Sequence, residues 1–232
     1  MSDDRLKKLV GSYQPNKDVL EAMKQINLLA TVGPSASGKT TVMNRLSEIY
    51  PHAHFVLDET SRVPRKNEQQ GVDFRFRRSQ DILEDLQRGD LVQIALGPNN
   101  DLYCTRLTSY PEAGVGMLAL IPPAVKEFRK LPVGSFRAAF IVPKNYETWL
   151  QWLDNQAHDS DWSDEQKKGR LAEAKLSYEF ALSDKKIHFV LNDTVDKAAL
   201  RLQAVCQATT PPDENRARQI AKENYKKLVE LL

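Results

Sequence analysis

The chain has 232 residues, 41% of them hydrophobic and 28% charged, with a formal net charge of +2 at pH 7. This composition is typical of a soluble globular protein with one α/β domain, and the nearly balanced charge gives no indication of a nucleic-acid or membrane partner. Two cysteines cannot build a disulfide framework. The first residues contain no apolar signal core, so we expect a cytoplasmic protein.

Apolar periodicity and turn residues predict alternating helices and strands along the chain. Helices are expected at residues 17–25, 40–49, 79–88, 146–153, 164–182, 195–205 and 213–232. Strands are expected at residues 28–32, 55–57, 91–95, 117–121, 138–142 and 187–191. Residues 58–78 are polar and basic, and residues 154–163 are predicted to form a polar, acidic loop.

This alternation predicts an α/β fold of the P-loop NTPase type, with a mostly parallel sheet flanked by helices, an inserted acceptor-binding lobe and a lid. We expect an N-terminal extension with a short helix at residues 1–25, a main domain at 26–208 and a C-terminal amphipathic helix at 209–232. The main domain would consist of a core at 26–57 and 112–208, the lobe at about 58–111 and the lid at about 154–166.

A complete phosphate-binding motif follows the first predicted core strand and opens a predicted helix. It reads Gly33, Pro34, Ser35, Ala36, Ser37, Gly38, Lys39 and Thr40, with Thr41 next in the chain. Glycines let backbone N–H groups turn toward phosphates, and the helix N-terminus adds the positive end of its dipole. Lys39 would contact the β- and γ-phosphates of ATP, and Thr40 would ligate Mg²⁺.

From this loop onward, over about residues 26–205, the chain resembles the guanylate kinase family. The resemblance rests on the Gly33 to Thr41 motif, on residues 60–65 (TSRVPR) followed by 71–76 (GVDFRF), and on residues 170–171 with 192–193. It implies a kinase that uses ATP with Mg²⁺ and a small phosphorylated acceptor, most naturally a nucleoside monophosphate. It leaves the oligomeric state open.

The resemblance also assigns an acceptor site. Arg62 and Arg65 would hold the acceptor phosphate through their guanidinium forks, and Tyr103 would donate to the same phosphate. The expected acceptor-binding residues are Asp58, Arg62, Arg65, Phe74, Gln93, Tyr103 and Thr105. The alternative for the two arginines is a solvated basic loop.

Several of these positions differ from the family pattern. Asp58 replaces a serine that reads guanine, Gln93 replaces a glutamate, and Phe74 replaces a tyrosine that assists the acceptor phosphate. Ala119 and Ile121 stand where the family has two aspartates. An ionised Asp58 would oppose the O6 acceptor of guanine, so strict specificity for GMP is not expected.

The predicted lid carries no arginine between Asp154 and Asp164, whereas the family places arginines there. Arg170 matches the one that follows the lid and would stabilise charge in the transition state; otherwise it is a surface residue paired with Glu173. Asn192 resembles the position that contacts the adenine of the donor.

Three interpretations of function remain open. The first is phosphoryl transfer to a nucleoside monophosphate with Lys39 and Arg170 as catalytic residues. The second is a hydroxyl kinase in which Asp58, expected at the end of a strand, acts as general base or lies near Mg²⁺, although a turn aspartate is equally consistent. The third is a non-catalytic guanylate kinase-like binding module, against which the complete phosphate loop argues.

Trp149 and Trp152 lie at i and i+3 on a predicted helix. This spacing places both rings on one face of the helix. It favours packing residues over a base-stacking platform.

Overall fold

The computed structural model describes residues 3–64, 68–97 and 100–232. These residues form two compact units. The first comprises the described parts of Met1–Leu28, His54–Gly116 and Lys126–Ser135, and the second comprises Leu29–Ala53, Met117–Val125 and Phe136–Leu232. None of the described residues lies in a helix that is both long and apolar enough to cross a membrane.

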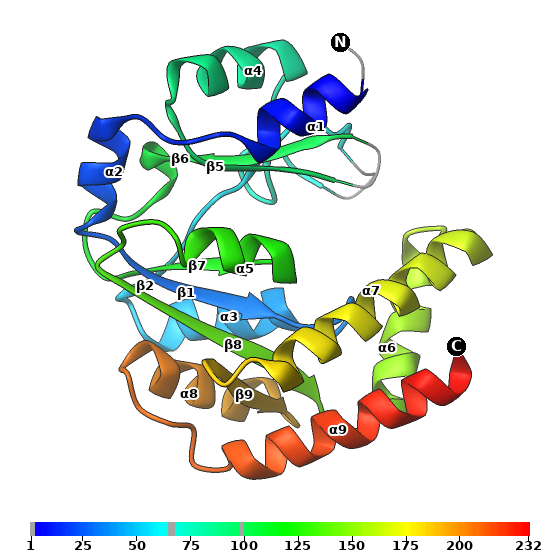
Figure 1. Cartoon of the computed structure of the whole chain (residues 1–232). Coiled ribbons are helices and arrows are strands. Elements are labelled where there is room, and N and C mark those ends of the chain that lie inside the picture. Colours follow the sequence, from blue (N-terminus) through cyan, green and yellow to red (C-terminus); the bar gives the residue numbers. More distant parts are fainter. Residues whose placement is uncertain (1–2, 65–67, 98–99) are drawn as a thin grey trace. The chain divides into compact units, whose positions relative to one another are not determined.

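A mostly parallel five-stranded sheet has the strand order β2-β7-β1-β8-β9 (Figure 1). Its strands are β1 (Asn27–Val32), β2 (Ala53–Phe55), β7 (Val115–Ala119), β8 (Ser135–Pro143) and β9 (Ile187–Asn192). β8 and β9 pair in parallel, with Ala138 opposite Ile187. Their middle residues are buried almost without exception, as expected for strands covered by helices on both faces.

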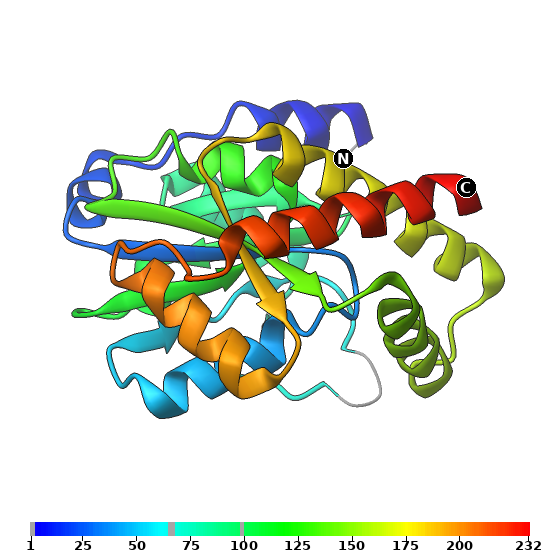
Figure 2. The ribbon, with the colours of Figure 1, turned by 90° about the horizontal axis from the view of Figure 1, so that it is seen from below.

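In the second unit, helices pack on both sides of this sheet (Figure 2). On one side α3 (Lys39–Ile49) packs against α8 (Val195–Cys206), and on the other α7 (Asp164–Ser183) packs against α9 (Glu214–Leu231). The aromatic centre of this core joins Phe140 of β8 to Tyr178 of α7, with ring centroids 5.0 Å apart, and to Phe189 of β9 at 5.7 Å. The predicted P-loop type of α/β fold is therefore confirmed.

The first unit is built on a four-stranded sheet with the order β4-β3-β6-β5. The strands are β3 (Glu59–Thr60), β4 (Arg75–Phe76), β5 (Leu91–Leu96) and β6 (Leu102–Arg106). β5 and β6 form an antiparallel pair, and β3 joins β6 antiparallel and β4 parallel. Helix α4 (Ser79–Arg88) packs on β5 and β6 through an apolar face that includes Ile82 and Leu86.

The N-terminal residues belong to this first unit. Helix α1 (Asp3–Gly11) packs against β5 through Leu6, Leu9 and Val10. Tyr13 donates its hydroxyl to the Leu91 carbonyl at 2.5 Å and accepts from the Leu91 N–H at 2.9 Å. Helix α2 (Lys17–Met23) then leads into β1. The predicted domain boundary at residue 25 stays a prediction.

Several predicted elements need correction. The strand predicted at 55–57 lies at Ala53–Phe55, and the strand predicted at 117–121 lies at Val115–Ala119. The prediction missed the strands β3, β4 and β6 and the helices α1 and α5 (Pro122–Phe128). Helix α5 begins with two prolines. Proline suits the first turn of a helix, where its missing N–H needs no partner. The short 3-10 helix η1 (Leu107–Ser109) completes the first unit.

The acidic loop predicted at 154–163 is mostly wrong. Helix α6 spans Tyr146–Asp159, so its last turns occupy the segment that looked like a loop. Asn145 caps its start by accepting from the Thr148 N–H at 2.8 Å, and the chain reverses at Asp161, whose φ is 54°. The second half of α6 has polar residues around most of its circumference, so it lacked the apolar period on which the prediction relied.

Candidate active site

The phosphate loop has the context that its motif requires. It connects β1 to α3, and its last residue Gly38 is the N-cap of α3 in the left-handed conformation, with φ 87°. A Cβ at Gly38 would lie 2.4 Å from the amide nitrogen of Asn192, so no side chain fits here. Ala36 also has a positive φ of 60°, which is strained for alanine. The loop is therefore held in a costly backbone form, as is common where backbone N–H groups face a ligand.

Lys39 folds back over the loop that precedes it. Its Nζ donates to the carbonyls of Gly33 at 2.9 Å and Pro34 at 2.8 Å, both of which are neutral acceptors. Burial, together with the positive charge of Arg170, lowers the pKa of Lys39 to about 8. The ammonium is thus placed where a phosphate would supply the missing negative charge.

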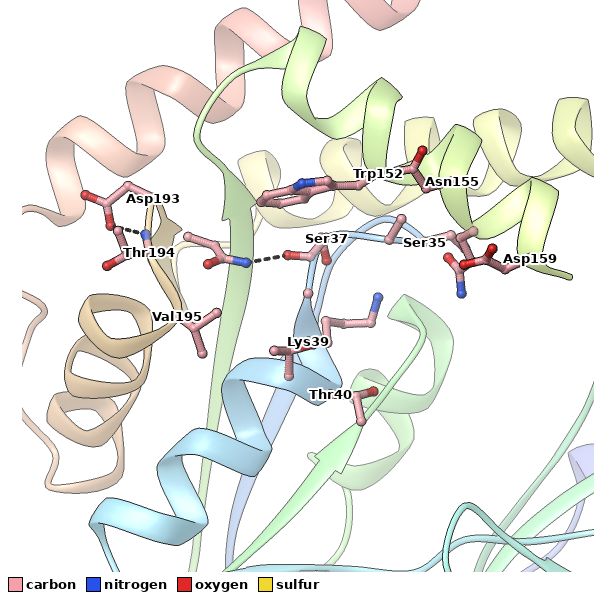
Figure 3. Close-up of a pocket in the computed structure, with 15 residues that line it drawn as sticks. Ser35, Ser37, Lys39, Thr40, Trp152, Asn155, Asp159, Asp193, Thr194 and Val195 are labelled. Atoms are coloured by element: carbon pink, nitrogen blue, oxygen red, sulfur yellow. Dashed lines mark hydrogen bonds between the residues drawn. The ribbon is translucent and has the colours of Figure 1, made fainter. Parts of the chain in front are cut away.

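A cavity of about 680 Å³ opens beside this loop within the second unit (Figure 3). Seven of the eight predicted phosphate-binding residues line it, namely Ser35, Ala36, Ser37, Gly38, Lys39, Thr40 and Thr41. The eighth, Gly33, accepts a hydrogen bond from Lys39 through its carbonyl. Asn192 also lines the cavity, and its amide nitrogen donates to the Ser37 carbonyl at 3.0 Å. Seven of the residues predicted from the motif therefore lie around one cavity.

Seven further lining residues were not predicted as site residues. They come from α6 and from the residues that follow β9: Trp152, Asn155, Gln156, Asp159, Asp193, Thr194 and Val195. The signal was present in the sequence, since residues 152, 155, 156 and 159 share one face of a helix. The sequence prediction ends this helix at residue 153, so it does not include the face that lines the cavity.

Trp149 and Trp152 have different surroundings. Trp149 is fully buried, as predicted, and packs edge-on against Tyr178 at 6.3 Å. Its indole N–H also donates to the Ser35 carbonyl at 2.8 Å, which ties α6 to the phosphate loop. Trp152 is half-buried and lines the cavity. For Trp152 the choice between packing and base stacking stays a prediction.

Arg170 lies on α7, near enough to Lys39 for its charge to lower the pKa of that lysine. Its guanidinium donates to Glu173 at 2.8 Å and stacks over the Trp162 ring at 5.3 Å. The pairing with Glu173 is the alternative noted from the sequence. A catalytic role for Arg170 stays a prediction.

Three of the predicted acceptor residues come together in the first unit. The Arg62 Nε donates to the Tyr103 hydroxyl at 3.1 Å, and its guanidinium lies 5.4 Å from the centre of the Phe74 ring. Glu68 pairs with Arg62 at 2.8 Å and would compete with an acceptor phosphate. Arg65 lies outside the described residues.

The other acceptor candidates lie on neighbouring strands. Gln93 of β5 faces Thr105 of β6 in the antiparallel register. Thr105 is fully buried, and its hydroxyl shares a hydrogen bond of 2.7 Å with the Tyr110 hydroxyl. Asp58 precedes β3 and has a buried Oδ1 with no hydrogen-bond partner in the described part of the chain. Burial raises the pKa of Asp58 to about 7.

The residues present suit Mg²⁺ bound together with a nucleotide. Thr40 lies in the first turn of α3, with its side chain at the cavity. Within residues 3–64, 68–97 and 100–232 no three His, Cys, Asp or Glu side chains gather as a metal site. Mg²⁺ typically takes one or two protein ligands and completes its shell with phosphates and water, so a single hydroxyl at a triphosphate site fits this ion.

The parallel sheet and the loop between β1 and α3 define an α/β protein of the P-loop NTPase type. No family model matches the chain. It is 32% identical to the guanylate kinase of Gloeobacter violaceus over 185 residues, which cover 77% of this chain and 84% of that protein. It is 25% identical to the guanylate kinase of Synechococcus sp. over 187 residues, covering 79% and 83%.

The fold agrees with these sequence relatives. The crystal structure of guanylate kinase from Anaplasma phagocytophilum aligns with a TM-score of 0.56 at 18% identity, covering 80% of this chain and 86% of that one. The chain belongs to the guanylate kinase family. The resemblance found in its motifs is thereby confirmed.

Proposed function

We propose that the protein is a kinase that transfers the γ-phosphoryl group of ATP to a nucleoside monophosphate. The observation that carries this proposal is Lys39, a cation held over a complete phosphate loop whose hydrogen-bond partners among the described residues are two carbonyl oxygens. Bound Mg²⁺ would supply charge neutralisation on the phosphates. The Arg62, Phe74 and Tyr103 group would hold the acceptor phosphate.

Each residue would act by position and charge, because phosphoryl transfer needs little covalent chemistry from the protein. Lys39 and the loop amides would bind the β- and γ-phosphates, Thr40 would contact the ion, and Arg170 would stabilise charge on the transferring group. Arg62 would release Glu68 when the acceptor phosphate arrives, since the phosphate carries more negative charge than a carboxylate.

The test is ADP formation by the purified protein with Mg²⁺ and ATP, across GMP, AMP, CMP, UMP and several sugar phosphates. We expect turnover with at least one nucleoside monophosphate, and turnover lower by about two to three orders of magnitude with the Lys39→Ala protein. ATP binding without turnover on any acceptor would contradict the kinase proposal and favour a nucleotide-dependent binding module.

A pH profile of KM would show whether the nucleobase of the acceptor nucleotide presents a hydrogen-bond acceptor or a hydrogen-bond donor to Asp58. If Asp58 faces guanine, only its protonated form can donate to O6, so the KM for GMP should rise as pH increases through about 7. If the base instead presents an exocyclic amine, the ionised form accepts and KM should fall over the same range. We expect KM to change about tenfold per pH unit on the side of the pKa where the binding form of Asp58 is the minor one, above the pKa in the first case and below it in the second. Asp58→Asn should lose this dependence. A flat profile in the wild type would show that Asp58 does not contact the base.

A second candidate is a kinase of a hydroxyl acceptor, favoured by the unpartnered, buried Oδ1 of Asp58. A carboxylate with a pKa near the working pH is well suited to a general base. In that case nucleosides or sugars would be phosphorylated, and Asp58→Asn would lower kcat by roughly 10²–10⁴-fold. The same substitution would leave kcat on a phosphate acceptor much less affected.

A further inference from the structure

One wall of the cavity is a helix face that carries an aromatic ring. Trp152, Asn155, Gln156 and Asp159 of α6 line the cavity together with the phosphate loop. Their spacing places all four on one side of the helix. Of the described residues that line the cavity, Trp152 alone is aromatic.

The position of this wall relative to the phosphate loop is fixed by Trp149. Trp149 is fully buried one turn before Trp152, and its hydrogen bond to the Ser35 carbonyl is 2.8 Å long. The ring of Trp152 is therefore presented to the cavity from a helix that cannot shift without breaking a buried contact with the loop. Such support reduces the entropy lost when a ligand packs on the ring.

In Figure 3 the Trp152 ring lies on one side of Ser35 and Ser37 of the phosphate loop, and Lys39 and Thr40 lie on the other. The ring extends from α6 toward the side on which Asp193, Thr194 and Val195 line the cavity. Because Lys39 and Trp152 line the same cavity, a nucleoside triphosphate with its phosphates at Lys39 would place its base beside Trp152.

Polar groups at this end already bind one another. The Asn192 amide nitrogen is committed to the Ser37 carbonyl, and the Asp193 carboxylate accepts from Arg201 at 2.5 Å and from the Thr194 N–H at 2.9 Å. These bonds hold the turn in place. Stacking on the Trp152 ring would add to any contact with the edge of the base, and it is largely indifferent to the identity of the base.

We propose that Trp152 stacks on the base of the donor nucleotide and that the donor site takes purine nucleoside triphosphates by stacking, GTP as well as ATP. The proposal rests on the proposed function only in treating this cavity as the donor site. Pyrimidine triphosphates should bind a few-fold more weakly because their ring is smaller.

The test compares ligands with and without a base. Calorimetry would give the Kd of ATP, GTP and inorganic tripolyphosphate for the wild type, Trp152→Ala, Trp152→Phe and Lys39→Ala. We expect Trp152→Ala to weaken ATP and GTP about tenfold and to leave tripolyphosphate unchanged. Trp152→Phe should recover most of the loss, and Lys39→Ala should weaken all three ligands. Gln151→Ala, an exposed neighbour on α6 that does not line the cavity, is the matched control.

Three results would overturn the stacking proposal. Trp152→Ala could weaken tripolyphosphate as much as ATP, which would indicate a role in shaping the loop. It could leave ATP binding unchanged, or the wild type could bind ATP a hundredfold more tightly than GTP, which would indicate reading of the base edge. Absence of turnover with every acceptor would contradict the kinase proposal alone, because these binding constants do not depend on catalysis.

Discussion

Lys39→Ala should lower kcat by about two to three orders of magnitude, the usual cost of removing one group that stabilises transition-state charge. Both hydrogen-bond partners of the Lys39 ammonium are carbonyl oxygens, so a bound triphosphate gains more from it than the free protein does. The folded state should lose little, and we expect the free energy of unfolding to stay within about 1 kcal/mol of the wild type. Steady-state kinetics and urea denaturation measure the two quantities.

The same lysine predicts a pH dependence of ATP binding. Its pKa is lowered to about 8, so the charged form that attracts phosphate is present below pH 8 and is lost above it. The Kd of ATP should therefore rise between pH 8 and pH 9 in the wild type and stay constant in Lys39→Ala. Lys222→Ala, an exposed lysine on α9, is the control for a general loss of positive charge. Turnover of Lys39→Ala within tenfold of the wild type would exclude Lys39 from the reaction.

Glu59→Gln should destabilise the first unit by roughly 3–5 kcal/mol, the range measured when one partner of a buried ion pair is removed. The Glu59 side chain is completely buried and accepts from Arg77 at 2.8 Å and Arg106 at 2.9 Å, with Arg75 at 3.6 Å. Glutamine has nearly the same shape, but it cannot neutralise these guanidinium groups and turns N–H donors toward them. Hydrogen exchange of the β3 and β6 amides would locate the loss.

The control is an exposed pair of the same kind in the same unit. Asp81 bonds Arg78 through both carboxylate oxygens, at 2.7 and 3.0 Å, but the Arg78 side chain is 84% exposed. Asp81→Asn should leave the free energy of unfolding almost unchanged, because solvent screens surface pairs. Equal effects of the two substitutions would show that water reaches the Glu59 cluster.

Elements with a strong apolar period could be predicted from the sequence to within a few residues. β1, α3 and α4 lie close to their expected ranges because each has a continuous apolar run or a clear amphipathic stripe. The last turns of α6 are polar and had no such stripe. α1 does have an apolar stripe at Leu6, Leu9 and Val10, and the prediction missed it. β3 and β4 are two residues long, too short for any period to appear.

The candidate site likewise has one part that could be predicted from the sequence and one part that could not. The phosphate loop could be found because its residues are contiguous and their chemistry requires a fixed spacing. The seven additional lining residues come from α6 and from the turn after β9, more than 110 residues beyond Lys39 by their numbering, and no local pattern connects them to the loop. The hydrogen bond between Trp149 and Ser35 also joins residues 114 positions apart, so no local pattern predicts it.

By itself, the sequence determined the phosphate loop, the α/β class and the family. These depend on short motifs and on apolar periods, which are patterns among residues that are close together in the sequence. Only the tertiary structure decided which side chains face the cavity, and how far burial shifts the pKa values of Lys39 and Asp58. Trp152 shows why: its spacing from Trp149 in the sequence predicts a packing residue, and only the folded chain shows that it lines the cavity. Burial and electrostatic environment are properties of the packed chain, so they follow from contacts between segments that are distant in sequence.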